Sequence, residues 1–394
     1  MESLVTRHRF MSIPVSKQTK MAKPGALFGG VFSGSKVLVT GHTGFKGAWL
    51  SEWLLDLGAN VTGFSLPPPT RPSLFEQIKL GNRLKHVEGD IRDSKALGQV
   101  VRDTGPDFIF HLAAQPLVRE SYRTPVETYQ TNVLGTIHLL EAARTLKKSC
   151  AVLCITTDKC YENKEWVYGY REEDPLGGYD PYSSSKAAAE IAIAAWRRSF
   201  FKNHPVKVAS ARAGNVIGGG DWAEDRIVPD CVRALQKRQP ISVRNKRATR
   251  PWQNVLDPLS GYLWLSALMA KPSLGGIDLD RLCTPFNFGP GHDANRSVAE
   301  LVEEILKCWP GRWEDHSDPK ALHEAGLLQL VTDKANALLG WSPVWGFSDS
   351  IRNTTEWYRQ AHRGGPTFAF HRLTSQQIAA YVRAACQRGM AWAA

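Results

Sequence analysis

The chain has 394 residues, of which 43% are hydrophobic, and this composition excludes a small or intrinsically disordered module. No apolar stretch reaches about twenty residues, so we expect a soluble protein without a membrane span. The formal charge is +11, from 49 Lys and Arg against 38 Asp and Glu, which permits nucleic acid, a membrane surface or a phosphorylated small molecule as partner.

The seven cysteines are scattered, with no CxxC pair and no His/Cys spacing typical of a zinc site. They predict reduced thiols, no bound metal and a cytoplasmic location. Residues 1–35 are basic and lack the apolar segment of a secretory signal. We expect them to be a disordered extension or the product of an early start codon, since Met21 is close; a transit peptide is the alternative.

From Lys36 onward, short apolar runs alternate with helical patterns. Such alternation predicts a doubly wound α/β fold whose parallel sheet is covered on both faces. We expect strands at residues 37–40, 59–65, 86–90, 108–114, 151–158 and 206–214, and helices at 48–58, 94–105, 126–146 and 183–201. Residues 36–214 would form this domain, to which later segments can return. Residues 215–394 would mainly form a smaller domain with C-terminal helices, leaving a cleft between the two.

The stretch GHTGFKG follows the first expected strand and opens the first expected helix. In such a turn Gly41 permits the tight bend, Gly44 lets a pyrophosphate approach the backbone, and Gly47 lets the helix pack on the strand. An ordinary glycine-rich turn is the alternative. The GxxGxxG spacing resembles the extended short-chain dehydrogenase/reductase family. Cofactor contacts are therefore expected from Gly41, Thr43, Gly44, Phe45 and Gly47.

The end of the second expected strand, Gly63-Phe64-Ser65, lacks the acid that usually binds a ribose 2′-hydroxyl, and Arg71 nearby could receive a 2′-phosphate. The residues alone therefore leave NAD and NADP open. The resemblance implies further cofactor contacts from Asp90, Ile91, Leu112, Ala113 and Ala114. Alternatively, Asp90 belongs to a helix N-terminus and the alanines belong to the core.

Tyr182 and Lys186 have YxxxK spacing and would share one face of a helix. A nearby ammonium is expected to lower the pKa of the phenol, so that it can accept a hydroxyl proton, and the same lysine can hold the nicotinamide ribose. Thr157, Asp158 and Lys159 follow the fifth strand, at the catalytic edge of such a sheet. A salt-bridged Asp158–Lys159 pair without catalytic function is the alternative.

Here the resemblance becomes narrower, because the chain is similar to nucleotide-sugar 4,6-dehydratases and, through Asp158-Lys159-Cys160-Tyr161, to those acting on CDP-glucose. The matching stretches are HLAAQPLVR, WVYGYRE, GGYDPYSSSK, RAGNVIGGGDWAEDRIVPD and RPWQNVLDPLSGYL, and the likeness extends from Lys36 to about Trp357. Asn254 departs from the pattern, in which His is expected.

The resemblance implies a hydro-lyase of deoxysugar biosynthesis, including that of lipopolysaccharide O-antigen. It implies a tightly bound, recycled NAD; NADP is less favoured. Tyr182 and Thr157 would act at the 4-hydroxyl, Lys159 would remove the C5 proton, and Asp158 would protonate the departing 6-hydroxyl. Lys159 needs a lowered pKa and Asp158 a raised pKa for these roles.

Substrate contacts are expected from Arg226 and Arg250, whose guanidinium groups could clamp a diphosphate, and from Asn215 and Gln115. Arg226 could equally be a surface charge. The implied substrate is CDP-glucose and the implied assembly a homodimer, with no nucleic-acid module and no membrane partner. The alternatives are an epimerase or dehydratase acting on a dTDP- or GDP-sugar, a reductase of the same fold, and a non-catalytic NAD(P)-binding regulator.

Overall fold

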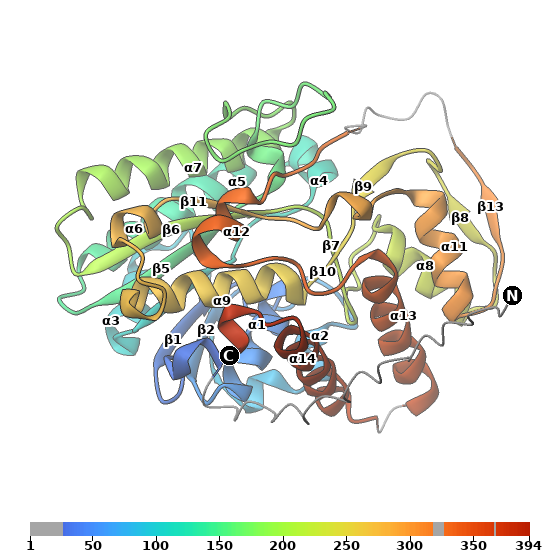
Figure 1. Cartoon of the computed structure of the whole chain (residues 1–394), viewed down its shortest axis with the longest axis horizontal. Helices are drawn as coiled ribbons and strands as arrows, with labels where there is room; N and C mark the ends of the chain where they lie inside the picture. Colours follow the sequence, from blue (N-terminus) through green and yellow to red (C-terminus); the bar gives the residue numbers. More distant parts are fainter. Residues whose placement is uncertain (1–26, 318–326, 366–367) are drawn as a thin grey trace, which may run out of the picture.

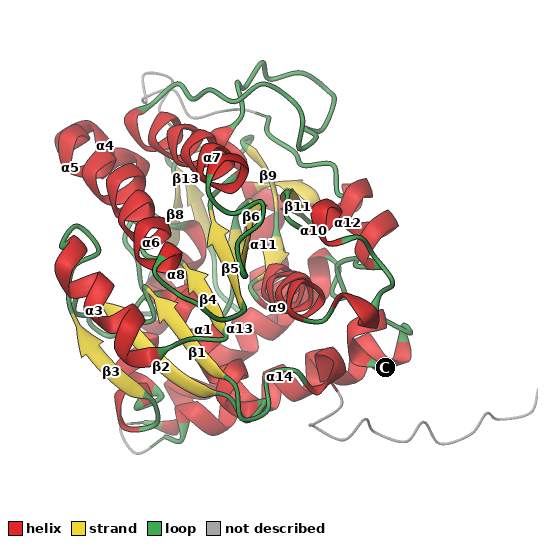
Figure 2. Cartoon of the chain, turned by 90° about the vertical axis from the view of Figure 1, so that its left-hand side faces the viewer, coloured by secondary structure: helices red, strands yellow, loops and turns green. Residues whose placement is uncertain are grey.

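The computed structural model describes residues 27–317, 327–365 and 368–394. Its centre is a parallel sheet of seven strands, which confirms the doubly wound α/β fold (Figures 1 and 2). In spatial order the strands are β11 (Pro285–Phe288), β6 (Val206–Ala213), β5 (Cys150–Ile155), β4 (Phe108–His111), β1 (Lys36–Thr40), β2 (Asn60–Ser65) and β3 (Lys85–Glu88).

Successive side chains of the central strands enter two different hydrophobic clusters, as the two-residue period of a strand requires. In β1, Val37 and Val39 join one cluster, whereas Leu38 joins the other. In β4, Phe108 and Phe110 lie with the first cluster and Ile109 with the second. The sheet is therefore buried on both faces, which explains why these strands are continuous apolar runs.

Two layers of helices cover these faces, and Figure 2 shows the strands between them. One layer contains α3 (Ser94–Thr104), α6 (Gly135–Arg144) and α7 (Pro181–Ser199). The other contains α1 (Phe45–Asp56), α9 (Leu256–Ala270) and α14 (Phe370–Gln387). The helix expected at residues 126–146 is divided into α5 (Pro125–Tyr129), a π-helical turn (Gln130–Leu134) and α6.

A smaller lobe lies beside the sheet and contains short two-stranded pairs with helices packed against them (Figure 1). The pairs are β7 (Val216–Ile217) with β10 (Gln253–Asn254), β8 (Ile241–Val243) with β13 (Trp313–Asp315), and β9 (Thr249–Pro251) with β12 (Asn295–Ser297). The remaining helices are α2 (Leu74–Gln77), α4 (Val118–Arg123), α8 (Ile227–Gln236), α10 (Leu279–Leu282), α11 (Val298–Cys308), α12 (Asp333–Leu339) and α13 (Phe347–Gly364). Because α9 and β11 return to the sheet, the chain after residue 214 contributes to both parts.

The end of the expected N-terminal extension is ordered, which corrects its limit at residue 35. Residues 1–26 lie outside the described residues, but Phe28 and Phe32 are fully buried. The Phe28 ring stacks on Trp392 with 5.0 Å between centroids, and Phe32 packs against Phe108 at 4.7 Å. Burial of these two rings stabilises the segment because aromatic side chains remove a large apolar area from water.

In the described part of the chain, no helix is long and apolar enough to span a lipid bilayer. All seven cysteines are free thiols, as expected, and four of them are buried: Cys150, Cys154, Cys160 and Cys231.

Candidate active site

The cofactor cradle predicted from the sequence lies where the sheet changes winding direction, between β1 and β4. Gly41 follows β1 with a φ of +77°, and a Cβ there would lie 2.6 Å from the Ala113 backbone nitrogen. A Cβ on Gly47 would lie 2.1 Å from the Gly41 oxygen, whereas one on Gly44 would meet nothing closer than 3.4 Å. Gly44 is the N-cap of α1 and makes no side-chain cap, so the first amides of α1 are available to a phosphate. This cradle fits a dinucleotide pyrophosphate.

Hydroxyl groups lie at the end of β2, the position where the sequence lacks the acidic residue that usually binds a ribose 2′-hydroxyl. Thr43 Oγ1 lies 2.7 Å from Ser65 Oγ and donates to the Leu66 carbonyl at 2.9 Å. Beside them, His42 Nε2 lies 2.7 Å from His86 Nδ1. Burial and the neighbouring His86 lower the pKa of His42 to about 3, so His42 is neutral at physiological pH.

The other predicted cofactor residues lie at the ends of β3 and β4. Asp90 accepts hydrogen bonds from the Arg92 backbone and side chain, and its pKa is lowered: burial opposes this shift, but the Arg92 interactions outweigh it. The N-cap of α3 is Asp93, so Asp90 does not have the alternative role of capping that helix. Ile91 is buried beneath Gly135, and Leu112, Ala113 and Ala114 are half-buried directly after β4.

Tyr182 and Lys186 lie on α7, which begins where Asp180 accepts a hydrogen bond from the Ser183 amide and Pro181 occupies the first turn. Both side chains are buried. The Tyr182 hydroxyl is hydrogen-bonded to Thr157, and Lys186 Nζ donates to the Ile155 carbonyl at 3.3 Å. The structure therefore brings the YxxxK pair to the end of β5.

The pKa values of this pair are set mainly by burial. Burial lowers the pKa of Lys186 to about 8. The pKa of Tyr182 is raised to about 12, opposite to the direction expected from the YxxxK spacing. Burial is the largest cause of this rise and Asp158 adds to it, while the Thr157 hydrogen bond and Arg226 oppose it. Desolvation of the phenolate thus outweighs the opposing effects of Thr157 and Arg226.

Asp158 and Lys159 form a short 3₁₀ turn, η4 (Asp158–Cys160), whose first residue follows the N-cap Thr157. Thr157 Oγ1 donates to Asp158 Oδ1 at 3.0 Å and accepts from the Lys159 amide at 3.3 Å. Asp158 is 3% exposed, and a Cβ on Gly214 would lie 2.7 Å from its carboxylate, so a side chain at residue 214 would displace that carboxylate. Lys159 is half-buried. Across the described residues, Asp158 and Lys159 form no ion pair with each other.

A buried polar network that the sequence did not reveal holds this turn on both sides. Glu190, on α7, accepts from Thr156 Oγ1 at 2.5 Å and from Arg212 Nη2 at 2.9 Å. Arg212 Nη1 donates to the Tyr161 hydroxyl at 2.8 Å. Both members of the ion pair are 2% exposed. Thr156 and Tyr161 flank the reactive turn, so the Glu190–Arg212 pair fixes where residues 157–160 lie. Glu190 is four residues after Lys186, which is the one sequence signal that could have suggested it.

The first of the predicted substrate residues is Arg226. It precedes α8, donates to Asp221 at 2.8 Å and interacts electrostatically with Tyr182. Asn215 lies between β6 and β7, and its backbone carbonyl accepts a hydrogen bond from the backbone N–H of Gln253 at 3.4 Å. Arg250 lies on β9, where its guanidinium donates to the Thr249 carbonyl. The Gln115 side-chain amide is hydrogen-bonded to the Leu117 backbone in the same loop and to the Thr128 hydroxyl on α5.

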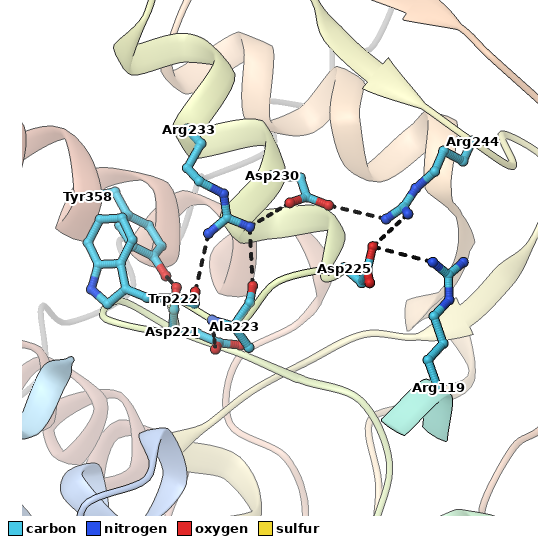
Figure 3. A network of polar contacts seen from close by, with 9 residues as sticks. All are labelled: Arg119, Asp221, Trp222, Ala223, Asp225, Asp230, Arg233, Arg244 and Tyr358. Carbon is cyan, nitrogen blue, oxygen red and sulfur yellow. Dashed lines mark hydrogen bonds and ion pairs between the residues drawn. The ribbon is translucent and has the colours of Figure 1, made fainter. Parts of the chain in front are cut away.

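The segment that carries Arg226 is attached to both lobes by the polar network in Figure 3. Asp225 pairs with Arg119 of α4 at 3.4 Å and with Arg244, which follows β8, at 2.7 Å. The Tyr358 hydroxyl donates to the Asp221 carbonyl at 2.5 Å. These contacts join residues 221–226 to α4, to the segment after β8 and to α13. Within the described ranges, no group of three His, Cys, Asp or Glu side chains could hold a metal ion.

The glycine cradle, the Tyr182–Lys186 pair and the sheet order define an extended short-chain dehydrogenase/reductase. More narrowly, the chain belongs to the GDP-mannose 4,6 dehydratase family, whose pattern matches residues 38–274. This confirms the resemblance inferred from the sequence.

Relatives agree with that assignment. A CDP-glucose 4,6-dehydratase of Salmonella typhimurium is 46% identical over 348 residues, which cover 84% of this chain and 93% of that protein. A probable dTDP-glucose 4,6-dehydratase of Sinorhizobium fredii is 26% identical, over 82% of this chain and 92% of that protein. Among solved structures, the dTDP-glucose 4,6-dehydratase DesIV of Streptomyces venezuelae, with NAD and TYD bound, has a TM-score of 0.68 at 26% identity and covers 82% of this chain and 97% of its own.

Proposed function

We propose that this protein is an NAD-dependent hydro-lyase that converts CDP-glucose to CDP-4-dehydro-6-deoxyglucose and water. The observation that carries the proposal is the buried Thr157–Asp158–Lys159 turn beside Tyr182, in a chain 46% identical to a CDP-glucose 4,6-dehydratase. A simple epimerase would need no acid and base for the loss of water, so this turn argues against that alternative.

Bound NAD would accept a hydride from C4 of the sugar and return it to C6. The Gly41–Gly47 turn and the first amides of α1 would hold its pyrophosphate, and Lys186 would hold its nicotinamide ribose. Tyr182 would take the proton from the 4-hydroxyl, and the Thr157 hydroxyl would hydrogen-bond the same oxygen.

The ketone formed at C4 acidifies the C5 proton, which Lys159 would remove as its neutral amine. Asp158 would give a proton to the 6-hydroxyl as the C6–O bond breaks, so that water departs. Lys159 would then return its proton to C5. The cofactor ends in the state in which it began, so we expect it to remain bound through turnover.

The nucleotide diphosphate would be bound by Arg226 and Arg250, with Asn215 and Gln115 as further contacts, because guanidinium groups give bidentate contacts to phosphate. The preference for CDP over dTDP or GDP follows from the 46% identical relative and from the Asp158-Lys159-Cys160-Tyr161 sequence. A dehydratase for dTDP-glucose is the second candidate, since DesIV has the same fold at 26% identity.

We also propose a homodimer formed through α5, the π-helical turn and α7. These elements pack side by side and expose apolar side chains: Val126 is 70% exposed, Leu134 46% and Ile191 58%. Val126 and Leu134 line a shallow hollow together with Pro125, Tyr129 and Val133. Light scattering should give twice the chain mass for the wild type and the chain mass for Val126→Asp/Leu134→Asp. A monomeric wild type would contradict this proposal.

A panel of CDP-, dTDP-, UDP- and GDP-glucose, each supplied with NAD, tests the proposed reaction. We expect the product of CDP-glucose to be lighter by one water in mass spectrometry, with a kcat/KM at least about tenfold above that of the other sugars. A product that keeps its oxygen, or a clear preference for another nucleotide, would contradict the proposal.

A further inference from the structure

Asn287 is a buried polar residue that the proposed reaction leaves unexplained. It lies on the four-residue strand β11 between two apolar residues and is fully buried. Its Oδ1 accepts a hydrogen bond from the Tyr161 hydroxyl at 2.7 Å. Its Nδ2 donates to the Tyr170 carbonyl at 3.0 Å and to the Val331 carbonyl at 3.2 Å, and its backbone N–H donates to Glu172 Oε1 at 2.8 Å. Since a polar side chain in an apolar core is costly unless it is hydrogen-bonded, these contacts account for asparagine at this position.

Tyr161 connects this asparagine to the reactive turn. It comes two residues after Lys159 and is 1% exposed. Its hydroxyl donates to Asn287 Oδ1 and accepts from Arg212 Nη1 at 2.8 Å, so the oxygen is used both as donor and as acceptor. Its ring stacks on Tyr170 with 5.1 Å between centroids. The side chain of Tyr161 is therefore held at its tip and along its face.

The place of Lys159 depends on this anchor because the two sides of the turn are held differently. Before the turn, the chain still belongs to the sheet, where the backbone N–H of Thr156 donates to the Ala211 carbonyl at 2.9 Å. After the turn the chain leaves the sheet, and Tyr161 is the first residue beyond η4. Among the residues that the structure describes, no hydrogen bond or ion pair holds the Lys159 ammonium. The direction of that side chain is therefore set by the backbone of the turn.

We propose that the Tyr161–Asn287 hydrogen bond positions Lys159 for removal of the C5 proton. Neither residue exchanges a proton with the sugar; both are positioning residues that fix the end of the turn. The proposal rests on the proposed dehydratase function and deepens it, since it adds a contact from β11 to the C5 step. A displacement of about 1 Å can cost a reaction about a hundredfold in rate, so one hydrogen bond at the end of the turn is enough to affect catalysis.

The test separates the two chemical steps in single turnovers with CDP-glucose and bound NAD. In the proposed reaction, C4 oxidation forms NADH on the enzyme and the later steps consume it. Tyr161→Phe removes the hydroxyl and keeps the stacked ring. We expect NADH to form within about threefold of the wild-type rate, because Tyr182 lies on α7, and to be consumed about 10–100-fold more slowly. Deuterium at C5 of the sugar should then slow the variant more than the wild type, because C5 proton removal limits its rate.

Tyr170→Phe is the matched control. Tyr170 is 2% exposed and belongs to the same ring stack, but its hydroxyl faces the following loop. There it accepts from the Lys164 N–H at 2.7 Å and donates to Asn163 Oδ1 at 3.1 Å. The backbone carbonyl that Asn287 contacts is unchanged in this variant. Both steps should therefore proceed at the wild-type rates.

Asn287→Ala assigns the effect to the bond itself. It should delay NADH consumption as Tyr161→Phe does, and adding Tyr161→Phe to it should change the rate by less than about twofold, because the two residues act through one contact. Circular dichroism shows whether Asn287→Ala is folded, since it also removes the bonds to Tyr170 and Val331. If it is not folded, Tyr161→Phe and its control decide the inference.

Four results would overturn the inference and leave the dehydratase intact. They are unchanged NADH consumption in Tyr161→Phe, equal slowing of both steps in that variant, the same delay in Tyr170→Phe, and additive losses in the double variant. A wild type that forms no 6-deoxy product from CDP-glucose would overturn the proposed function and this inference with it.

Discussion

The candidate site has two edges that are built in opposite ways: the cofactor edge is the glycine turn near β1 and β4, and the reactive edge is the Thr157–Lys159 turn near β5 and β6. Around β1 and β4 the cradle is formed by missing side chains, since Gly41 and Gly47 occupy places where any Cβ would collide with backbone. Around β5 and β6 the reactive turn is held by buried charge, in the Glu190–Arg212 pair and its hydroxyl partners. In the proposed mechanism, a bound cofactor needs a fixed shape, whereas proton transfers to and from the sugar need groups whose protonation is set by their surroundings.

The largest expected effect tests the reactive edge. Tyr182→Phe removes the hydroxyl that would accept the 4-hydroxyl proton, so C4 oxidation should slow by about 10²–10⁴-fold in single-turnover absorbance measurements. Tyr168→Phe is the matched control, since Tyr168 is 70% exposed, and its rate should equal that of the wild type. A Tyr182→Phe protein that oxidises C4 at full speed would contradict the role of Tyr182.

The next largest effect is on protein stability and concerns the buried Glu190–Arg212 ion pair beside the Thr157–Lys159 turn. Glu190→Gln leaves Arg212 as an uncompensated buried charge, so the free energy of unfolding should fall by about 3–5 kcal/mol in urea titrations. Glu120→Gln breaks an exposed pair with Arg123 and should change it by less than about 0.5 kcal/mol. Similar losses in both variants would show that burial does not distinguish the two pairs.

At the cofactor edge, we expect added side chains to act through their size. Two neighbouring glycines, Gly44 and Gly47, distinguish an effect on protein stability from an effect on NAD affinity. Gly47→Ala forces its Cβ against the Gly41 oxygen, so thermal unfolding should show a loss of about 1–3 kcal/mol. Gly44→Ala has more room and should leave stability nearly unchanged, yet weaken NAD binding by about tenfold or more, because the methyl group occupies the approach to the pyrophosphate. Unchanged NAD affinity in Gly44→Ala would disprove the assigned place of the phosphates.

A further prediction is a pH dependence of stability that originates at His111, between the glycine turn and the Thr157–Lys159 turn. His111 lies between Thr40 and Thr136, and burial, with help from Lys186, lowers its pKa to about 3. Between pH 6.5 and 3 the unfolded chain binds the extra proton, so His111 makes stability fall as the pH falls, by at most about 1.4 kcal/mol per pH unit. His111→Gln should show a shallower decline in unfolding free energy across this window, and an identical decline would contradict the assignment.

The sequence predicted most of the sheet, because buried parallel strands are continuous apolar runs that differ from the helices between them. It missed β11, a strand of only four residues that follows the short helix α10 in the second half of the chain. It also placed residues 27–35 in a disordered tail, since nothing local indicates that Phe28 meets Trp392 near the other end of the chain.

The site was predictable where spacing carries the signal, as in GxxGxxG and YxxxK. It was not predictable where tertiary contacts decide, as for the Glu190–Arg212 pair, whose partners come from different elements. The direction of the Tyr182 pKa shift was also missed, because the extent of burial follows from the complete fold.

The most direct measurement of the central claim is NMR of the product formed from CDP-glucose in heavy water with catalytic NAD. We predict a 4-keto-6-deoxy sugar with deuterium at C5, no accumulation of NADH, and loss of the C5 label in Lys159→Met. Stoichiometric NADH with the 6-hydroxyl retained would instead identify a plain dehydrogenase and contradict the dehydratase mechanism.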